Sequence, residues 1–421
     1  MPGLDEIVRT LDSIGAAVSI GGRTLLRADT NPVPREWDHV TKVDPEKTKQ
    51  LPLLYPLYLA HTSAVSIGGS QNVTEQNTLE TFDLVNAASV PEFHEPSEAT
   101  HVTETVHDRA EFMAVPEVLN GDTDSIVGAL GRSLEHGNEE IAPRLIRQKV
   151  PIPLGETIEN RVSNFVTSWL FDQAVFEAYI IMNVDSAAAR EANVTESDLL
   201  SPREAKQHAM AAEHHLESEI IYLEYSGRFG GEEAADLLET ISGAVSWPRV
   251  WYGGGLDSRE NARSMLDAGA DAVVVGDIFH QVAAEECDHC EAAAADLGTD
   301  ADRAAVEAWV EEHVDVSGSS AAAFLLTVPD LPDPEQRARE YVAATIETYL
   351  GLQSVAETIG SPADTGDIER ALDDHGVVPG AEHVCQVLDD GTFHRRLVVS
   401  LVADAAGLSA DLPVSHLGVD L

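Results

Sequence analysis

The sequence predicts an α/β protein, a (β/α)8 barrel that carries an inserted helical segment and a mostly helical C-terminal extension. The first observation is three short apolar runs between residues 219 and 279, EIIYLEYSG, RVWYGGGLDS and ADAVVVGDIF, which are typical of strands buried on both faces. The second is the helical spacing of Ala, Leu and Met over residues 234–244 and 258–268, between these runs. Strand and helix therefore alternate, as in a parallel barrel.

The third observation is that glycine turns close two consecutive predicted strands, at Gly253-Gly254-Gly255 and at Gly276. Without a Cβ, the backbone N–H groups of such turns can approach an anion closely. Asp257 or Ser258 can cap the helix that follows. Because the loops after the seventh and eighth strands of a barrel form a phosphate site, we expect a phosphate here, although the glycines could also serve only to close tight turns.

The N-terminal half supplies the earlier strands. Residues 3–15 have the periodicity of a short amphipathic helix. The first strand, 37–43, ends at Lys42 and Asp44, which are either a surface ion pair or, as alternate residues, two side chains that point into one site. The second strand, 64–67, runs into Gly68-Gly69-Ser70 and a helix that begins near Glu75. Residues 90–96 and 112–119 supply the third and fourth strands.

The strand–helix alternation fails over about residues 135–176, a segment with three prolines and an aromatic stretch. We expect an inserted pair of short helices that covers one end of the barrel, where it either shapes a hydrocarbon tunnel or packs as core. The alternation resumes with a strand at 177–183 and a helix at 202–216. With strands near residues 40, 65, 92, 115, 180, 221, 250 and 274, the count reaches eight.

A barrel of roughly 250 residues leaves much of the 421-residue chain over. We therefore predict an N-terminal extension at 1–36, a barrel domain at 37–285 and a helical extension at 286–421. The extension has helical periodicity over 303–314, 334–359, 368–374 and 395–406. Its role is expected to be dimer contacts or docking near a membrane, and His383, Cys385 and His394 are more simply explained as packed side chains than as a site.

The charge balance excludes some functions. Acidic residues outnumber basic ones 73 to 26, for a net charge of −47, and are spread along the whole chain. Such an excess suits concentrated salt, where self-repulsion is screened, so we expect a halophile's cytoplasm. Nucleic acid is not an expected partner, because no basic face could neutralise phosphates. The N-terminus does not resemble a signal peptide, and no apolar run approaches the about 18 residues of a membrane span.

Three cysteines are too few for a disulfide framework. Cys287 and Cys290 form the motif CDHC with His289. A zinc site would need a fourth ligand, either His280 or a distant group. Reduced thiols on a helix are the other explanation.

Six motifs resemble, in order and position, those of the geranylgeranylglyceryl phosphate synthase family and its bacterial heptaprenylglyceryl phosphate relatives: WDHVTKVDPEK, SIGGSQNVTEQNT, AVPEVLN, YLEYSG, YGGGLDS and VVVGD. The combination of YLEYSG, YGGG and KVDPEK is far more specific than one glycine turn. The resemblance implies a TIM-barrel prenyltransferase, a phosphoglycerol geranylgeranyltransferase of lipid biosynthesis. Such an enzyme uses Mg²⁺ to join the 3-hydroxyl of sn-glycerol 1-phosphate to geranylgeranyl diphosphate, which makes the first ether bond of archaeal membrane lipids.

The resemblance also implies site residues. Asp44 and Ser70 match the metal positions and offer the oxygen ligands that Mg²⁺ prefers. Lys42 matches a contact to glycerol phosphate, and Glu224 is the expected base for the attacking hydroxyl, or else only orients the glycerol. The substrate-binding set is Lys42, Tyr222, Leu223, Glu224, Tyr225, Ser226, Gly227, Gly253, Gly254, Gly255, Gly276 and Asp277. A homodimer, peripheral at a membrane, is the expected assembly.

Two departures from the family pattern leave an alternative open. Asp277 stands where the family usually carries Asn, and a carboxylate there opposes a phosphate by about 1–4 kcal/mol at moderate dielectric. Ser63-Ala64-Val65 stands where an Asp usually precedes the second strand. The alternative is a divergent, non-catalytic paralogue that binds prenyl or glycerol phosphate. A different phosphate-binding barrel enzyme would leave YLEYSG and KVDPEK unexplained.

Overall fold

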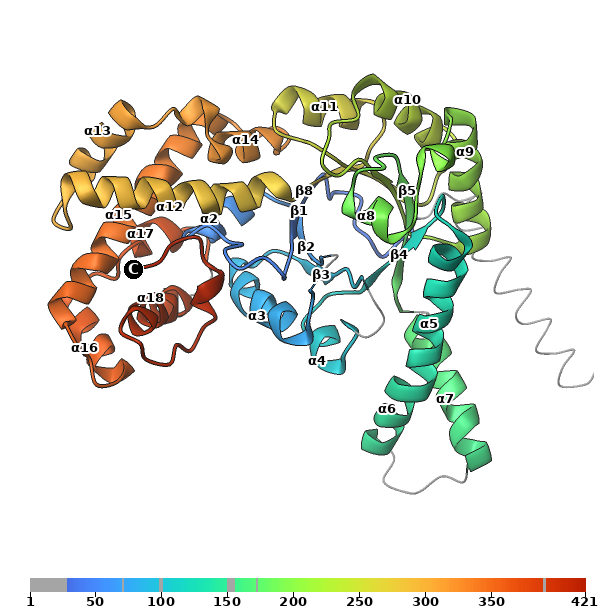
Figure 1. Ribbon diagram of the computed structural model, residues 1–421, viewed down its shortest axis with the longest axis horizontal. Helices are drawn as coiled ribbons and strands as arrows, with labels where there is room; N and C mark the ends of the chain where they lie inside the picture. Colours follow the sequence, from blue (N-terminus) through green and yellow to red (C-terminus); the bar gives the residue numbers. More distant parts are fainter. Residues whose placement is uncertain (1–28, 70–71, 98–100, 150–155, 172, 389–390) are drawn as a thin grey trace, which may run out of the picture.

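Eight parallel strands form a nearly closed barrel in the computed structural model (Figure 1), which describes residues 29–421 except 70–71, 98–100, 150–155, 172 and 389–390. The sheet order is β3-β2-β1-β8-β7-β6-β5-β4. A single bridge between His94 and Met113 connects the two edge strands. The strands are β1 (His39–Val43), β2 (Ala64–Ile67), β3 (Glu92–His94), β4 (Ala114–Val118), β5 (Val175–Ile181), β6 (Ile220–Glu224), β7 (Arg249–Gly253) and β8 (Ala272–Val275).

The predicted fold class and all eight strands are confirmed, with ends that shift by a few residues. Register is regular, as in the pairs Val40 with Ala64 and Tyr222 with Trp251. The predicted helix at 3–15 lies outside the described residues. The helices that accompany the barrel are α2 (Tyr55–Leu59), α3 (Glu75–Val85), α4 (Glu104–His107), α8 (Ala187–Glu191), α9 (Pro202–Ala211), α10 (Gly231–Ser242), α11 (Arg259–Asp267) and α12 (Asp277–Leu297).

Local signals in the sequence explain where several of these helices begin. Thr74 caps α3 and Ser201 caps α9, each through a reciprocal side-chain and backbone pair. Ser258, one of the two predicted caps, accepts the N–H of Asn261 at the start of α11. These caps set where each strand-to-helix loop ends, and therefore which residues reach the mouth of the barrel.

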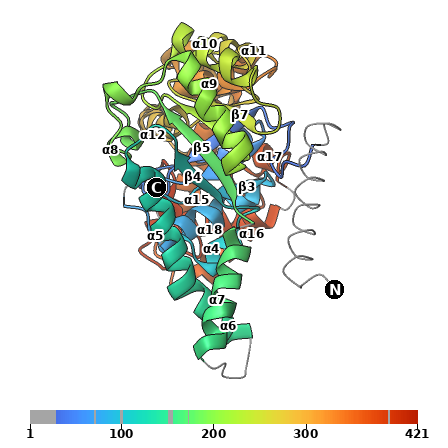
Figure 2. The same ribbon diagram turned by 90° about the vertical axis from the view of Figure 1, so that its right-hand side faces the viewer.

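The insertion forms a helical hairpin, and the prediction that it covers one end of the barrel was wrong. Its first arm comprises α5 (Ala129–His136), a π-helical turn (Gly137–Ile141) and α6 (Ala142–Lys149), and its second arm is α7 (Glu156–Phe171). The hairpin stands out from the barrel beside β4 and β5 (Figures 1 and 2). The two arms pack closely, because a Cβ at Gly137 would lie 3.3 Å from the Thr167 methyl group. The arms therefore pack against each other, through contacts that no short-range pattern encodes.

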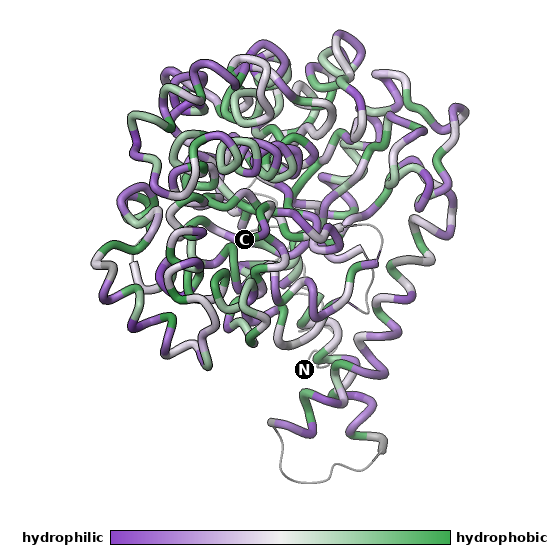
Figure 3. Tube along the Cα trace, turned by 60° about the vertical axis from the view of Figure 1, so that its left-hand side comes forward, coloured by the Kyte–Doolittle hydropathy of each residue, from purple (hydrophilic) through white to green (hydrophobic). Residues whose placement is uncertain are grey.

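The C-terminal extension is helical, as predicted, and packs against the barrel. Its helices are α13 (Arg303–His313), α14 (Ser320–Thr327), α15 (Pro334–Ile359), α16 (Thr365–His375), α17 (Ala381–Val384) and α18 (Gly391–Ala405). The predicted domain boundary at 285/286 falls inside α12, and the division into domains stays a prediction. Green apolar and purple polar positions are interspersed along the tube in Figure 3, and apolar residues of the extension such as Phe324, Leu350 and Leu401 are buried. None of the helices in the described part of the chain is long and apolar enough to cross a membrane.

Barrel and extension share one apolar core. Tyr58 of α2 packs edge-on against both Phe324 of α14 and Tyr341 of α15. His39 at the start of β1 lies 3.0 Å from the Thr327 hydroxyl. Leu51 accepts the N–H of Gly418, which connects the final residues to the loop after β1. The extension therefore buttresses the side of the barrel that carries β1.

Candidate functional site

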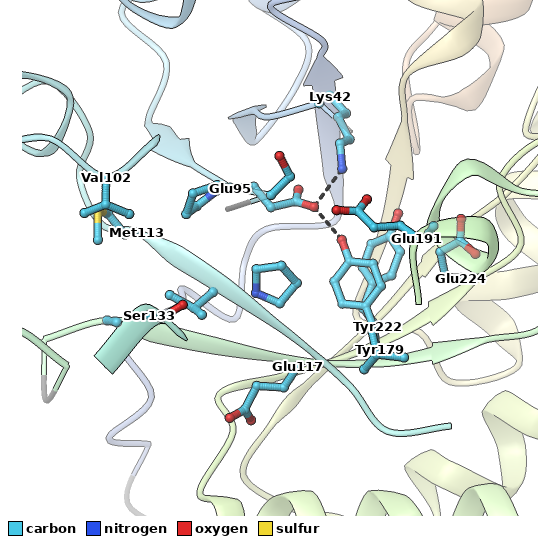
Figure 4. A pocket seen from close by; sticks show the side chains of 18 of the residues that line it. Lys42, Glu95, Val102, Met113, Glu117, Ser133, Tyr179, Glu191, Tyr222 and Glu224 are labelled. Carbon is cyan, nitrogen blue, oxygen red and sulfur yellow. Dashed lines mark hydrogen bonds and ion pairs between the residues drawn. The ribbon is translucent and has the colours of Figure 1, made fainter. Parts of the chain in front are cut away.

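One large cavity opens at the carboxyl ends of the strands and continues to the helical hairpin (Figure 4). Its volume is about 1620 Å³. At the barrel end it is lined by loops that follow β1, β2, β3, β6, β7 and β8, and at the far end by β4 and the hairpin. Catalytic and binding residues of barrel proteins gather at this face, so the cavity is the candidate site.

Glu95, directly after β3, interacts with side chains from three other strands at the centre of the barrel. Its Oε1 is 2.7 Å from the Lys42 ammonium and accepts the Tyr179 hydroxyl at 2.5 Å, while its Oε2 accepts the Ser66 hydroxyl at 2.9 Å (Figure 4). These partners come from β1, β5 and β2. The predicted glycerol phosphate contact, Lys42, is therefore already paired with a carboxylate.

A second carboxylate, Glu177 of β5, lies in the same centre. Burial raises the pKa of Glu177 well above its usual value, and the neighbouring Glu95 carboxylate raises it further. Burial by itself lowers the pKa of Lys42, but Glu95 and Asp44 more than offset this and the net change is upward. Lys42 thus stays charged, and protonation of Glu177 relieves the repulsion between the two carboxyl groups.

Asp44, a predicted metal ligand, faces the cavity after β1. Its Oδ2 lies 3.1 Å from the Lys47 ammonium, which also reaches Asp277 at 3.6 Å. The His280 Nε2 accepts the Asp44 N–H at 3.2 Å, and its Nδ1 lies 2.9 Å from the Gln50 carbonyl. This pattern assigns the proton to Nδ1. Burial lowers the pKa of His280, which agrees with a neutral ring that holds the loop rather than an ion pair.

The turn after β2 brings Gly69 against a carboxylate that sequence reasoning missed. A Cβ on Gly69 would lie 1.8 Å from Oε2 of Glu46, so a larger residue would displace this carboxylate from the turn. Asp44, Gly69 and Glu46 all line the cavity. Ser70, the other predicted metal ligand, lies outside the described residues, and its role stays a prediction.

Side chains of the YLEYSG segment point to both sides of the barrel wall at β6. Tyr222 and Glu224 face the cavity, and Tyr222 stacks on Tyr179 with 4.5 Å between ring centroids. Leu223 and Tyr225 are instead buried in the core outside the barrel. Alternate residues of a strand face opposite sides, so the side chains of these two predicted binding residues do not reach the cavity.

Glu224 has the environment of a base. The side chain is 2% exposed, its Oε1 accepts the Ser226 N–H at 3.0 Å, and its Oε2 lies 3.5 Å from the Ser186 hydroxyl. Burial raises the pKa of Glu224, while its hydrogen bonds and Lys42 oppose the rise. A higher pKa makes the ionised carboxylate a better proton acceptor.

The glycine turns close the other side of the site, and Ser226, Gly227, Gly253, Gly254, Gly255, Gly276 and Asp277 all line the cavity. A Cβ on Gly253 would lie 1.9 Å from the Tyr222 hydroxyl, and Gly255 has a φ of 54°. Glycine is favoured at 253 by the close approach of the Tyr222 hydroxyl, and at 255 by the positive φ. At Gly276 the nearest atom to a Cβ would be Lys42 Cβ at 3.5 Å, an ordinary van der Waals contact, so the protein itself does not exclude a side chain at this position.

Asp277 is the first residue of α12. Its side chain is 71% exposed and lies near the Lys47 ammonium. The α12 N-terminus, with backbone N–H groups that have no intrahelical partner, therefore adjoins the cavity at Gly276. The carboxylate that departs from the expected pattern does not lie buried in that position.

The far part of the cavity is mostly apolar. Met113, Val115 and Val118 contribute from β4 or its approach, and Val162 and Trp169 contribute from α7. The insertion was predicted either to shape a hydrocarbon tunnel or to pack as core, and this limb has the position that such a tunnel requires.

The cysteine motif forms no zinc site with His280. Cys287 and Cys290 lie on α12 as free thiols. His280 is bonded instead to the loop after β1. Within the described ranges, one group of metal-ligating side chains converges, Glu347, Glu382 and His383, and it belongs to the extension.

Sequence reasoning missed Glu46, Lys47, Glu95, Glu177 and Tyr179. Glu95 could have been found as a carboxylate at the carboxyl end of the third predicted strand, in the segment VPEFHEP, at the same mouth as Lys42 and Asp44. Glu177 and Tyr179 lay within a predicted strand whose inward face was not assigned.

Comparisons with known proteins match the part of the chain that forms the barrel. The PcrB family matches residues 33–294. The geranylgeranylglyceryl phosphate synthase of Methanocella arvoryzae is 29% identical over 248 residues, and that of Natronomonas pharaonis is 31% identical over 254 residues. Each alignment covers 59% of this chain and 92% of the relative. Among solved structures, (S)-3-O-geranylgeranylglyceryl phosphate synthase from Thermoplasma acidophilum, in complex with substrate sn-glycerol-1-phosphate, has a TM-score of 0.43 and 18% identity over 61% of this chain and 90% of that one.

Proposed function

This chain belongs to the PcrB family, and from that premise we propose that it is a Mg²⁺-dependent prenyltransferase that joins the 3-hydroxyl of sn-glycerol 1-phosphate to geranylgeranyl diphosphate. One observation carries the proposal. A single cavity connects the glycine turns, a buried carboxylate at Glu224 and a long apolar limb. A small phosphate, a reacting hydroxyl and a hydrocarbon chain need these three surroundings in this order.

The acceptor would lie at the glycine side of the cavity. The open position at Gly276 and the N-terminus of α12 suit its phosphate, with Lys47 as a nearby cation. Tyr222 and Ser226 offer hydrogen bonds to the glycerol. Glu224 would then lie beside the hydroxyl that attacks.

The residues after β1 and β2 fit a hard cation. Asp44 and Glu46 bring carboxylate oxygens to the turn at Gly69, and Mg²⁺ prefers one or two such ligands together with substrate oxygens and water. When bound, Mg²⁺ would neutralise the diphosphate and make it a better leaving group. Without such a cation, the carboxylates around Lys42 oppose a diphosphate.

In the proposed transfer step, one bond to C1 of the prenyl chain forms as another breaks. The hydroxyl oxygen of the glycerol forms a bond to C1 of the prenyl chain as the bond from C1 to the diphosphate oxygen breaks. Glu224 takes the hydroxyl proton, and diphosphate carries away the bonding electron pair. The neutral face made by Tyr179 and Tyr222 would lie near C1, where positive charge develops.

The apolar limb would hold the hydrocarbon chain. It runs from the barrel mouth past Met113 and Val115 to Val162 and Trp169. Side chains at its far end would then set how long a prenyl chain is accepted. Geranylgeranyl is the length that the names of the relatives suggest.

A second candidate function is a barrel that binds glycerol phosphate or a prenyl phosphate without turnover. The pairing of Lys42 with Glu95 favours it, because a cation expected to meet the substrate phosphate is neutralised within the protein. An active enzyme would have to exchange this partner or use Lys42 only to position Glu95.

One assay separates the two candidates. Purified chain in molar KCl with Mg²⁺ is given labelled sn-glycerol 1-phosphate and geranylgeranyl diphosphate, and label that enters an organic phase is counted. We expect transfer that is lost on chelation and in Asp44→Ala. Folded protein that binds glycerol phosphate but transfers no prenyl chain of any length would overturn the enzyme and leave the binding barrel.

A further inference from the structure

The loop that follows β1 carries carboxylates that could hold a metal ion. In this loop, residues 44–50, Asp44 and Glu46 line the cavity and Lys47 pairs with Asp44. The loop's own backbone hydrogen bond, from the Lys47 N–H to the Asp44 carbonyl at 3.2 Å, closes only its first turn. Ligands that are ordered before a metal ion arrives bind it more tightly, because binding then costs less entropy. Contacts from outside the loop therefore decide how well these carboxylates are placed.

The C-terminal tail, residues 414–421, supplies such contacts at the end of the loop. The His416 carbonyl accepts the N–H groups of Gln50 at 2.9 Å and Leu51 at 3.0 Å. The Leu51 carbonyl in turn accepts the Gly418 N–H at 2.8 Å. The tail thus lies beside the end of the loop and pairs with it as a parallel strand does.

Gln50 connects the tail to Asp44. Gln50 is fully buried. In the amide orientation that satisfies its surroundings, its NH2 group donates to the carbonyls of Asp44 at 2.8 Å and Lys47 at 3.1 Å, and its oxygen accepts the Thr81 hydroxyl at 2.8 Å. The Gln50 carbonyl also lies 2.9 Å from Nδ1 of His280. A shift of the tail would therefore move Gln50, and with it the start of the loop as well as its end.

Two helices that begin at the mouth of the barrel hold the tail in turn. The His416 side chain lies 2.9 Å from the carboxylate of Glu80 on α3, the helix that follows the turn at Gly69. A Cβ on Gly418 would lie 2.4 Å from the carbonyl oxygen of Ala283 on α12. The tail backbone therefore lies directly against α12, and the tail joins the loop to both helices.

We propose that the tail positions the loop after β1, so that Asp44 and Glu46 are in place for a divalent cation with diphosphate. His416 and Gly418 act through Gln50 and are positioning residues. The PcrB match ends at residue 294, so the family pattern does not account for this contact. The inference rests on the proposed function, because it assigns to the loop the cation that the transfer needs.

Hydrogen exchange in the unaltered protein tests the coupling. Mg²⁺ with inorganic diphosphate is added in molar KCl, and mass spectrometry follows exchange in peptides that cover residues 44–51, the tail and α16. Coupling between two sites is reciprocal, so a ligand that the loop binds must also protect the tail. We expect exchange to slow at least about fivefold in loop and tail. The control is α16, which packs against α15 and α18 and should be unchanged.

Gly418→Ala tests the direction from tail to ligand. Its Cβ would overlap the backbone of α12 and so displace the tail, while every hydrogen-bonding group stays in the chain. By calorimetry, we expect binding of Mg²⁺ with inorganic diphosphate to weaken about tenfold or more, as when a group that orients a metal ligand is lost. The number of sites per chain should not change. Thr327→Val is the matched control, because it removes a contact between extension and barrel at His39, the opposite end of β1, and should bind as the wild type does.

Three outcomes would overturn the positioning role. These are protection of the loop without protection of the tail, wild-type affinity in Gly418→Ala, and fewer sites at unchanged affinity, which would mean only that less protein is folded. If Gly418→Ala does not fold, exchange in the unaltered protein still decides. A wild type that does not bind Mg²⁺ with diphosphate would overturn the proposed metal site and this role together, whereas binding that leaves the tail unprotected would overturn this role alone.

Discussion

Individual carboxyl groups set the chemistry of the site, and burial is what distinguishes them. Glu224 is nearly inaccessible and accepts a backbone N–H, while Asp277 at the same mouth is mostly exposed. The first therefore has a raised pKa, and the second can turn to solvent and Lys47. Two carboxyl groups at one mouth therefore differ: one has the buried environment that suits a proton acceptor, and the other is a surface group.

Glu224→Gln keeps the shape of the side chain but cannot take a proton. We expect turnover to fall about 100- to 10,000-fold, the usual contribution of a general base. Binding of sn-glycerol 1-phosphate, followed by calorimetry, should remain. If binding is lost while residual turnover is normal, Glu224 orients the glycerol instead.

Glu286 on α12 predicts how stability depends on pH. Its carboxylate accepts the Leu53 N–H and contacts Tyr58 and Thr345, and burial raises the pKa of Glu286 to about 8. The folded state therefore holds a proton that the unfolded state has released above its ordinary pKa of 4.5. The contribution of protonated Glu286 to stability is present in full below pH 4.5 and is lost as the pH rises toward 8.

We expect the temperature at the midpoint of thermal unfolding to decrease as the pH is raised from 5 to 8. Glu286→Gln, which resembles the protonated form, should flatten part of this fall, and Glu92, with a pKa also raised to about 8, supplies another part. Asp288→Asn, exposed on the same helix, is the control. A midpoint that rises over this range in the wild type would contradict the assignment.

At the scale of single elements, the turns after the strands decide what the barrel can bind. The turn after β7 is crowded by the protein, with Tyr222 against Gly253, whereas the turn after β8 leaves Gly276 open. Two glycines that look alike in the sequence therefore have different reasons to be glycine. One is required by packing, and the other is available to a ligand.

Alanine at these two positions should separate the two reasons. Gly253→Ala should lower the free energy of unfolding by about 1–3 kcal/mol, as overpacking does, because its Cβ would overlap the Tyr222 hydroxyl. Gly276→Ala should change stability by less than about 1 kcal/mol yet weaken glycerol phosphate binding. Denaturant titration and calorimetry measure the two effects. Equal loss of stability in both variants would remove the distinction.

At the scale of the whole molecule, barrel and extension are joined by a common core and by the final residues. The contacts of Tyr58, of His39 and of Gly418 all cross between them. α12 runs without a break from the cavity into the extension. Neither part therefore buries its apolar surface without the other.

We expect a single cooperative unfolding transition, measured by calorimetry, with a midpoint that rises from 0.1 M to 3 M KCl. The rise follows from the net charge of −47, because salt screens the self-repulsion of the folded state. An equal concentration of sucrose, which is neutral, controls for solvent effects other than screening. Two well-separated transitions would show that the extension is an independent domain.

The sequence by itself determined the eight strands, their order, the caps of several helices and the glycine turns. These follow from local causes, namely apolar periodicity, capping residues and turn chemistry, which act over a few neighbouring residues. The family resemblance then placed Lys42, Asp44, Glu224 and Gly276 around one mouth, and the structure brings them there.

Only the tertiary structure decided which partner each group meets. Glu95 joins Lys42 and Tyr179, which lie 53 and 84 residues away in the chain. His280 holds the loop after β1 instead of a zinc ion, and the hairpin projects beside β4 and β5. The physical reason is that these contacts exist only once the barrel has closed, because closure brings distant strand ends to one face.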